Sequence, residues 1–417
     1  MSRRRQLFFI FLAVCATLPG LYIRLASMDL SAPLTALLSG VAIMGASFLL
    51  LWACDAAQNE IPQALALAIV ALIAVLPEYA VDIYFTWQAG QDPSGSYSHY
   101  AIANMTGANR LLIGIAWPTI ALIFWIKTRR PVRLEPERRT ELFFLGLATV
   151  YAFSIPIKGT LNWYDGVVLL AIYAWYIRLA GKRDVVESEA EGPAELLLDL
   201  PCWPRRLATA GMFLFSALVI LANAQPFSEG LVATGKLWGI NEFLLVQWLA
   251  PIASETPEFV VAIMFALRGQ AGLSLGSLLS AKLNQWTLLV GMIPWVFALS
   301  SGRLHPALPM GTFQMNEVLL TAAQSLLGVI LLATLRLSLP QAGLLVALFL
   351  GQLLSPGLVA QLPGGTLAGL GPDQMHGLFT VLYFGAAAAL IAHQPARLRE
   401  LWAGRNLAAC RGHECEK

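Results

Sequence analysis

Apolar stretches long enough to cross a lipid bilayer recur along almost the whole chain. Of its 417 residues, 57% are hydrophobic and only 12% are charged, and the mean hydropathy is +0.66. Because a spanning helix needs about 20 mainly apolar residues, this pattern predicts an all-α polytopic membrane protein with about twelve transmembrane helices. The predicted spans are residues 7–25, 32–54, 61–88, 99–126, 141–157, 163–180, 206–224, 241–267, 273–299, 315–335, 340–355 and 375–393. The segment 340–355 is short for a span and is expected to be tilted or partly re-entrant.

The positions of the basic residues support this number of spans, because Lys and Arg are enriched in cytoplasmic loops. With the N-terminus in the cytoplasm, 21 of the 27 Lys and Arg residues fall on the inside and 4 on the outside, while Arg110 and Lys282 lie within spans. We therefore expect an integral protein of a bacterial inner (plasma) membrane with both termini cytoplasmic. The polar loop 181–205 is interpreted as a cytoplasmic linker with a short helix at 193–199.

Two Pro-Glu pairs, Pro77-Glu78 and Pro257-Glu258, lie inside predicted spans, 180 residues apart. A carboxylate within a span is costly to insert and is by default a functional-site hypothesis. A proline lacks the backbone N–H, so it is expected to interrupt the helix and to free carbonyl groups for a ligand. The doubled motif indicates a transporter built from two repeats.

Five predicted spans lie on each side of the linker once the first and last are set aside. Because five is an odd number, the second half enters the membrane from the opposite face, which makes the two halves inverted repeats. In both halves the Pro-Glu pair falls in the second span of five, and a Gly- and Ser-rich patch opens the third. The predicted domains are an N-terminal flanking helix (1–31), the first repeat (32–180), the linker (181–205), the second repeat (206–355) and a C-terminal helix and tail (356–417).

This arrangement resembles the calcium/cation antiporter superfamily, which includes sodium/calcium and cation/proton exchangers. Each half of those proteins carries Gly-Thr-Ser-x-Pro-Glu on one helix and Gly-Ser-Asn-x-x-Asn/Asp on the next, and the resemblance is most specific over 71–114 and 249–291. It implies a secondary active antiporter that exchanges Ca²⁺ or another cation for H⁺ or Na⁺ by alternating access, with no cofactor beyond the transported ions. It also implies that Glu78 and Glu258 are the main metal ligands, one from each half.

Further polar residues near the two motifs extend this predicted cation-binding site. Asp82 follows Glu78 by four residues and Glu255 precedes Glu258 by three, so each pair shares a helical face. Carboxylates suit a divalent cation, and coupled buried carboxylates also suit proton exchange. The alternative for Asp82 is a place near the outer end of its helix. The predicted cation-binding set is completed by Ser254, Asn109 and Gln285.

The sequence departs from the exchanger motif at two basic residues. Gly-Ser-Asn is replaced by Gly107-Ala108-Asn109 in the first half and by Ser280-Ala281-Lys282 in the second, and Arg110 follows Asn109. We expect Lys282 and Arg110 to tune the site, because a buried lysine can replace a bound sodium ion or release a proton when a cation arrives. The alternative is a non-transporting or altered-specificity homologue in which these two residues lock the acids in salt bridges.

Other classes of function have little support in the sequence. No nucleotide-binding loop, zinc-protease motif or hydrolase elbow occurs, so we expect a transporter rather than an enzyme, with inorganic cations and the lipid bilayer as partners and no nucleic acid. An intramembrane enzyme using the paired carboxylates is the competing hypothesis. The five scattered cysteines predict no disulfide framework, and Cys410, His413 and Cys415 are interpreted as part of a free tail rather than a metal site.

Three histidines, His99, His305 and His376, fall near the expected outer ends of spans. We interpret them as loop histidines, with proton sensing as the alternative.

Overall fold

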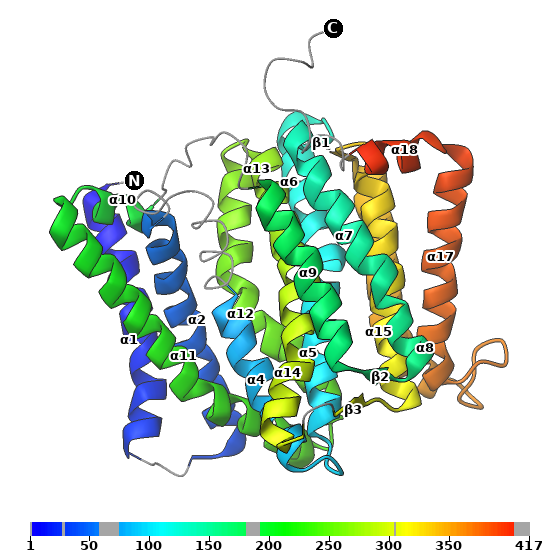
Figure 1. The fold of residues 1–417 in the computed structure, drawn as a ribbon, viewed down its shortest axis with the longest axis horizontal. Coiled ribbons are helices and arrows are strands. Elements are labelled where there is room, and N and C mark those ends of the chain that lie inside the picture. The colour runs from blue at the N-terminus through cyan, green and yellow to red at the C-terminus, as the bar shows by residue number, and fades with distance from the viewer. Residues whose placement is uncertain (1, 27–29, 58–74, 181–191, 304–305, 404–417) are drawn as a thin grey trace, which may run out of the picture. The chain divides into compact units, whose positions relative to one another are not determined.

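The computed structural model describes residues 2–26, 30–57, 75–180, 192–303 and 306–403, and most of these residues are helical (Figure 1). Within the described residues, 10 helices or continuous helical runs are long and apolar enough to cross a membrane. The prediction of an all-α polytopic membrane protein is confirmed. The chain divides into two compact units, which are described separately.

Unit 1 comprises residues 1–105, 177–258 and 299–302. It contains α1 (Arg3–Ala26), α2 (Ala32–Ala57), α4 (Leu76–Gln91), α10 (Pro193–Leu198), α11 (Cys202–Trp238), the start of α5 (Tyr97–Leu111) and α12 (Glu242–Leu267) as far as Glu258. In this unit α2 packs against both α1 and α11 (Figure 1). A glycine permits the close approach of α1, because a Cβ at Gly45 would lie 2.7 Å from the carbonyl oxygen of Ala13.

Unit 2 comprises residues 106–176, 259–298 and 303–417. It contains the remaining parts of α5 and α12 and most of α9 (Trp163–Ala180) and α14 (Val290–Ser301). Its other helices are η1 (Leu112–Ala116), α6 (Trp117–Thr128), η2 (Pro136–Arg138), α7 (Arg139–Ala152), α8 (Ser154–Lys158), α13 (Ala271–Asn284), η3 (Gln285–Leu289), α15 (Thr312–Leu332), α16 (Leu339–Ala360), η4 (Pro372–Gln374), α17 (Met375–His393) and α18 (Ala396–Ala403). Here α15 packs against α7 and α17, and α16 packs against α6.

Two very short antiparallel strand pairs connect loops within unit 2. Strand β1 (Val132–Arg133) pairs with β4 (Arg336–Leu337), and β2 (Thr160–Leu161) pairs with β3 (Leu308–Pro309). Strand β3 precedes α15 and β4 follows it, so a ladder stands at each end of that helix.

The observed helices differ from the predicted spans in several places. Only α4 represents the predicted span 61–88, whose residues 61–74 lie outside the described residues. Helix α11 has 37 residues and extends well beyond the predicted 206–224. The segment 340–355 lies within α16, an uninterrupted helix of 22 residues rather than a broken re-entrant one.

The predicted interruption at proline is wrong for α12. This helix continues through both Pro251 and Pro257, although neither proline has an N–H to donate. The carbonyl of Ala253, four residues before Pro257, therefore lacks its usual intrahelical donor while the helix keeps its direction. In the first half, Pro77 instead lies in the first turn of α4, where a missing N–H costs little.

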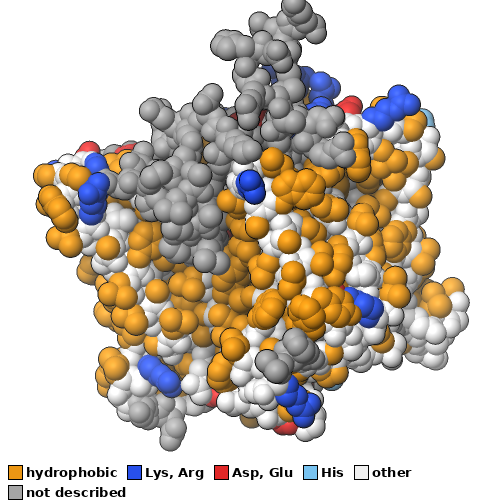
Figure 2. Space-filling view, viewed as in Figure 1, with side chains coloured by type: hydrophobic (Ala, Val, Ile, Leu, Met, Phe, Trp, Pro, Cys, Tyr) orange, Lys and Arg blue, Asp and Glu red, His pale blue; other side chains and the backbone are white. Residues whose placement is uncertain are grey.

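The outer surfaces of the helices are hydrophobic. Exposed Leu, Phe and Tyr side chains follow α1 and α11, and Figure 2 shows hydrophobic side chains predominating on the face in view. In water such surfaces would drive association, whereas in a bilayer they face lipid. The chain is an integral membrane protein.

Candidate functional site

The two acids of α4 are buried in unit 1. Glu78 is 2% exposed and Asp82 is fully buried, one helical turn further along the same face. Asn104 of α5 donates a hydrogen bond of 2.7 Å from its side-chain amide to Oδ1 of Asp82. Asp82 therefore lies in the interior of the unit and not at a solvated helix end.

The acids of α12 occupy the other half of the candidate site in unit 1. Glu255 is buried and Glu258 is half-buried, three residues further along the helix. The hydroxyl of Ser254 lies 3.3 Å from the carbonyl oxygens of both Ala250 and Pro251. This local bonding uses the hydroxyl hydrogen, so the oxygen lone pairs of Ser254 can still face a cation.

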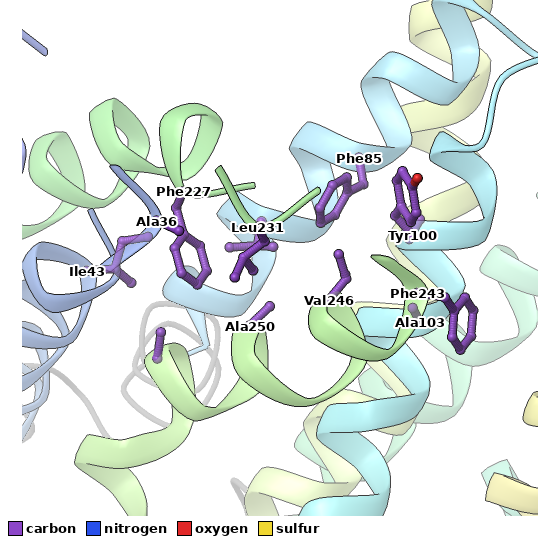
Figure 3. Packing of buried hydrophobic residues seen from close by; sticks show 13 residues of the cluster. Ala36, Ile43, Phe85, Tyr100, Ala103, Phe227, Leu231, Phe243, Val246 and Ala250 are labelled. Carbon is purple, nitrogen blue, oxygen red and sulfur yellow. The ribbon is translucent and has the colours of Figure 1, made fainter. Parts of the chain in front are cut away.

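One hydrophobic cluster packs the helices that carry these acids. Phe85 of α4, Tyr100 of α5 and Val246 and Ala250 of α12 belong to it, together with residues of α2 and α11 such as Phe227 (Figure 3). The rings of Phe85 and Tyr100 lie 5.7 Å apart. The cluster places Asp82, one residue from Val81, and Ser254, one residue from Ala253, on helices that share a core.

The acids do not form a cage by themselves. Among the described residues, no three His, Cys, Asp or Glu side chains gather closely enough to hold a metal ion. Ca²⁺ takes six to eight oxygen ligands, so a cation held by these acids needs neutral oxygens or water as well. The tail residues Cys410, His413 and Cys415 lie outside the described residues.

In unit 2, Lys282 and Asn109 contact each other. The ammonium group of Lys282 is fully buried and donates hydrogen bonds to the backbone carbonyl of Asn109 at 3.0 Å and to its Oδ1 at 2.6 Å. The same ammonium group lies 4.7 Å from the ring centroid of Trp286, within the range of a cation–π interaction. The side-chain nitrogen of Lys282 is thus surrounded by polar and aromatic partners.

The helices that carry Asn109 and Lys282 share a rare feature. A π-helical turn begins three residues after each of them, at Leu112 (η1) and at the fully buried Gln285 (η3). Such turns are often associated with functional sites. Because they occupy corresponding places in the two halves, they support the alignment of Asn109 with Lys282 made from the sequence.

Arg110 has an acidic partner that the sequence analysis did not select. Its guanidinium pairs with the carboxylate of Glu317 on α15, and the two side chains are 1% and 0% exposed. Glu317 lies in the predicted span 315–335, so the rule that singled out the Pro-Glu acids also applied to it.

Buried acids on the packed helices of a polytopic membrane protein are typical of ion pathways and proton relays. The family model described as sodium/calcium exchanger protein matches residues 31–181 and 208–355. The chain therefore belongs to the sodium/calcium exchanger family. Its two matched segments confirm a fold with two exchanger repeats and a membrane cation antiporter as the type of protein.

Solved structures agree with this family. The crystal structure of the H⁺/Ca²⁺ exchanger CAX is 41% identical in sequence, with a TM-score of 0.89 and coverage of 97% of this chain and 98% of that one. The sodium–calcium exchanger NCX_Mj, soaked with 2.5 mM Na⁺ and 0.1 mM Sr²⁺, is 18% identical and has a TM-score of 0.52, with 80% and 99% covered. At this low identity, the similarity to NCX_Mj shows a common fold and nothing more.

A curated relative extends the comparison. The uncharacterized membrane protein MJ0091 of Methanocaldococcus jannaschii is 22% identical over 191 residues, which make up 45% of this chain and 59% of that protein. The match thus spans less than two thirds of the relative's length.

Proposed function

We propose that this protein is a secondary active antiporter that exchanges Ca²⁺ for H⁺ by alternating access. The observation that carries the proposal is the pair of Pro-Glu carboxylates, Glu78 and Glu258, on two helices of unit 1 that share a hydrophobic core. Carboxylates are hard oxygen ligands suited to Ca²⁺, and they bind H⁺ at the same atoms. The 41% identity to an H⁺/Ca²⁺ exchanger supports this choice of ions over Na⁺ as the counter-ion.

Each candidate residue has a role in this proposal. Glu78 and Glu258 are the main cation ligands, for which Ca²⁺ and H⁺ compete. Asp82 and Glu255 supply further negative charge, and Ser254 supplies a neutral oxygen. The remaining roles are those predicted from the sequence: Asn109 and Gln285 as additional oxygen ligands, and Lys282 and Arg110 as cations that tune the site.

Transport by reconstituted protein tests the proposal. Proteoliposomes loaded with a pH indicator should report H⁺ movement when a Ca²⁺ gradient is applied, and Glu78→Gln and Glu258→Gln should each abolish it. Glu135→Gln is the matched control, because that carboxylate is 54% exposed and its ion pair with Arg138, at 3.6 Å, lies outside the candidate site. Unchanged flux in both site variants would overturn the proposal. A wild-type protein without flux in Ca²⁺, Na⁺ or K⁺ gradients would favour the non-transporting alternative.

The proposed orientation places both termini in the cytoplasm of a bacterium, with the protein in the inner membrane. It rests on the excess of Lys and Arg in the loops assigned to the inside. Protease should remove tags on either terminus only in inverted vesicles. Removal of one tag from right-side-out vesicles would exclude an even number of spans.

A further inference from the structure

The buried Arg110–Glu317 pair of unit 2 has a third member. Oε1 of Glu317 lies 2.5 Å from Nδ1 of His376, which belongs to the first turn of α17. This contact is attractive when the imidazole is protonated, because the ring then carries the opposite charge to the carboxylate. Glu317 therefore faces a permanent cation on one side and a titratable ring on the other.

The three side chains become more buried from His376 inward. The side chain of His376 is 13% exposed, whereas those of Glu317 and Arg110 are 0% and 1% exposed. His376 thus has access to the surface at the N-terminal end of α17. A proton can reach Glu317 through this ring without crossing the hydrophobic interior.

Aromatic and amide side chains lie near this group of three residues. The ring of Phe313 from α15 lies 5.9 Å away, and Tyr383 on the next turns of α17 is buried near Arg110. Helix α16 contributes the neutral amide of Gln352 to the surrounding polar groups. Glu317 is thus the acidic partner of His376, and Arg110 in turn is the basic partner of Glu317.

The triad continues toward the polar residues of α5. Gln324 of α15 donates a hydrogen bond of 3.2 Å to the backbone carbonyl of Arg110. Arg110 directly follows Asn109, which accepts the hydrogen bonds of Lys282. A change of charge at Glu317 is thus felt one residue away from a predicted cation ligand.

We propose that His376 and Glu317 form a proton-binding site, separate from the Pro-Glu carboxylates, through which the pH at the N-terminal end of α17 sets the charge facing Arg110. With a proton on His376, the Glu317 carboxylate is shared between two cations and holds Arg110 less firmly. Without a proton on His376, the Glu317 carboxylate forms its ion pair with Arg110 alone. His376 is a positioning residue here, and its effect on transport rests on the proposed function.

The transport test compares two histidines of the same helix. In proteoliposomes with the pH varied from 5 to 8 only on the side that α17 enters, the range in which imidazoles ordinarily change charge, wild-type exchange should vary several-fold. His376→Gln should flatten this profile while retaining exchange at its plateau. His393→Gln, at the exposed far end of α17, should keep the wild-type profile. An unchanged profile in His376→Gln would overturn the proposal.

A second measurement is independent of transport and of the fold of His376→Gln. In a protein whose other histidines, His99, His305, His393 and His413, are replaced by Gln, the imidazole resonances of His376 should shift as the pH is varied. Adding Glu317→Gln should displace that titration, and adding Glu135→Gln should not. Absence of titration, or a curve indifferent to Glu317→Gln, would reject the proton site. A wild-type protein without flux would reject only the proposed function.

Discussion

Lys282 of α13 donates hydrogen bonds to two oxygens of Asn109 on α5, at 3.0 Å to the backbone carbonyl and 2.6 Å to Oδ1. The two residues occupy the same place in the two repeats, three residues before a π-helical turn. The contact therefore joins corresponding points of the two halves. Its asymmetry, with an ammonium on one side and an amide on the other, shows how far the repeats have diverged at this point.

The first prediction concerns the strength of this contact. In a double-mutant cycle, Lys282→Met and Asn109→Ala should show a coupling free energy of about 1.5–3 kcal/mol, because the hydrogen bonds have a charged donor and are buried. Unfolding of purified protein in detergent measures it. Asn109→Ala with Lys127→Met is the control, since Lys127 binds the carbonyl of Leu267 near the far end of α6. Equal coupling in both cycles would show that the contact contributes nothing specific.

The second prediction concerns the buried Arg110–Glu317 pair. Arg110→Met or Glu317→Leu alone should lower the free energy of unfolding by about 3–5 kcal/mol, because each removes one partner of a buried ion pair. The double variant Arg110→Met/Glu317→Leu should recover much of that loss. Denaturation of each protein measures these values, with Glu135→Gln expected to stay within about 0.5 kcal/mol of wild type. A double variant as unstable as the sum of the two single variants would contradict the prediction.

The third prediction concerns the packing of η1 against α16. A Cβ at Gly114 would lie 2.3 Å from ring atoms of Phe349, which is 1% exposed. Gly114→Ala should therefore destabilise the protein by about 1–3 kcal/mol through overpacking, and adding Phe349→Leu should relieve part of the cost. The melting temperature of each variant measures this. Gly343→Ala on α16 is the control, because its Cβ would have no neighbour within 4 Å.

The fourth prediction separates Asp82 from the two main acids. Asp82→Asn keeps the shape of the side chain and removes its charge, so exchange should persist with an apparent Ca²⁺ affinity lowered roughly tenfold, equivalent to about 1.4 kcal/mol. Flux measured against Ca²⁺ concentration gives the value. Asp92→Asn, at the exposed C-terminal end of α4, should leave it unchanged. An unaltered affinity in Asp82→Asn would assign Asp82 a structural role with Asn104.

Much of the fold was predictable because the membrane restricts the alternatives. Nearly every backbone polar group within a bilayer must bond internally, so apolar length alone locates helices such as α2 and α17 within a few residues. The basic residues and the Pro-Glu pairs then indicate the order of the spans and the repeat. The burial of Asp82 agrees with its predicted place beside Glu78 on one helical face.

The features that could not be predicted depend on tertiary contacts. Neither Pro257 nor its neighbours reveal that α12 stays continuous, since this depends on the packing that supports the helix at Ala250 and Ala253. Nothing local marks the π-helical turns after Asn109 and Lys282. The pairing of Glu317 with Arg110 joins residues 207 positions apart, and only the contact between their helices brings them together.

The two strand pairs of unit 2 bracket α15. Strand β3 ends three residues before the helix begins, β4 starts four residues after it ends, and each bonds to a partner from the first half. A helix tethered at both ends resists sliding along its axis, since any shift would break one ladder or the other. The axial position of Glu317 is therefore fixed by the two strand pairs. When the protonation of this site changes, we therefore expect the side chains of Arg110 and His376 to change rotamer. We do not expect α15 to shift along its axis.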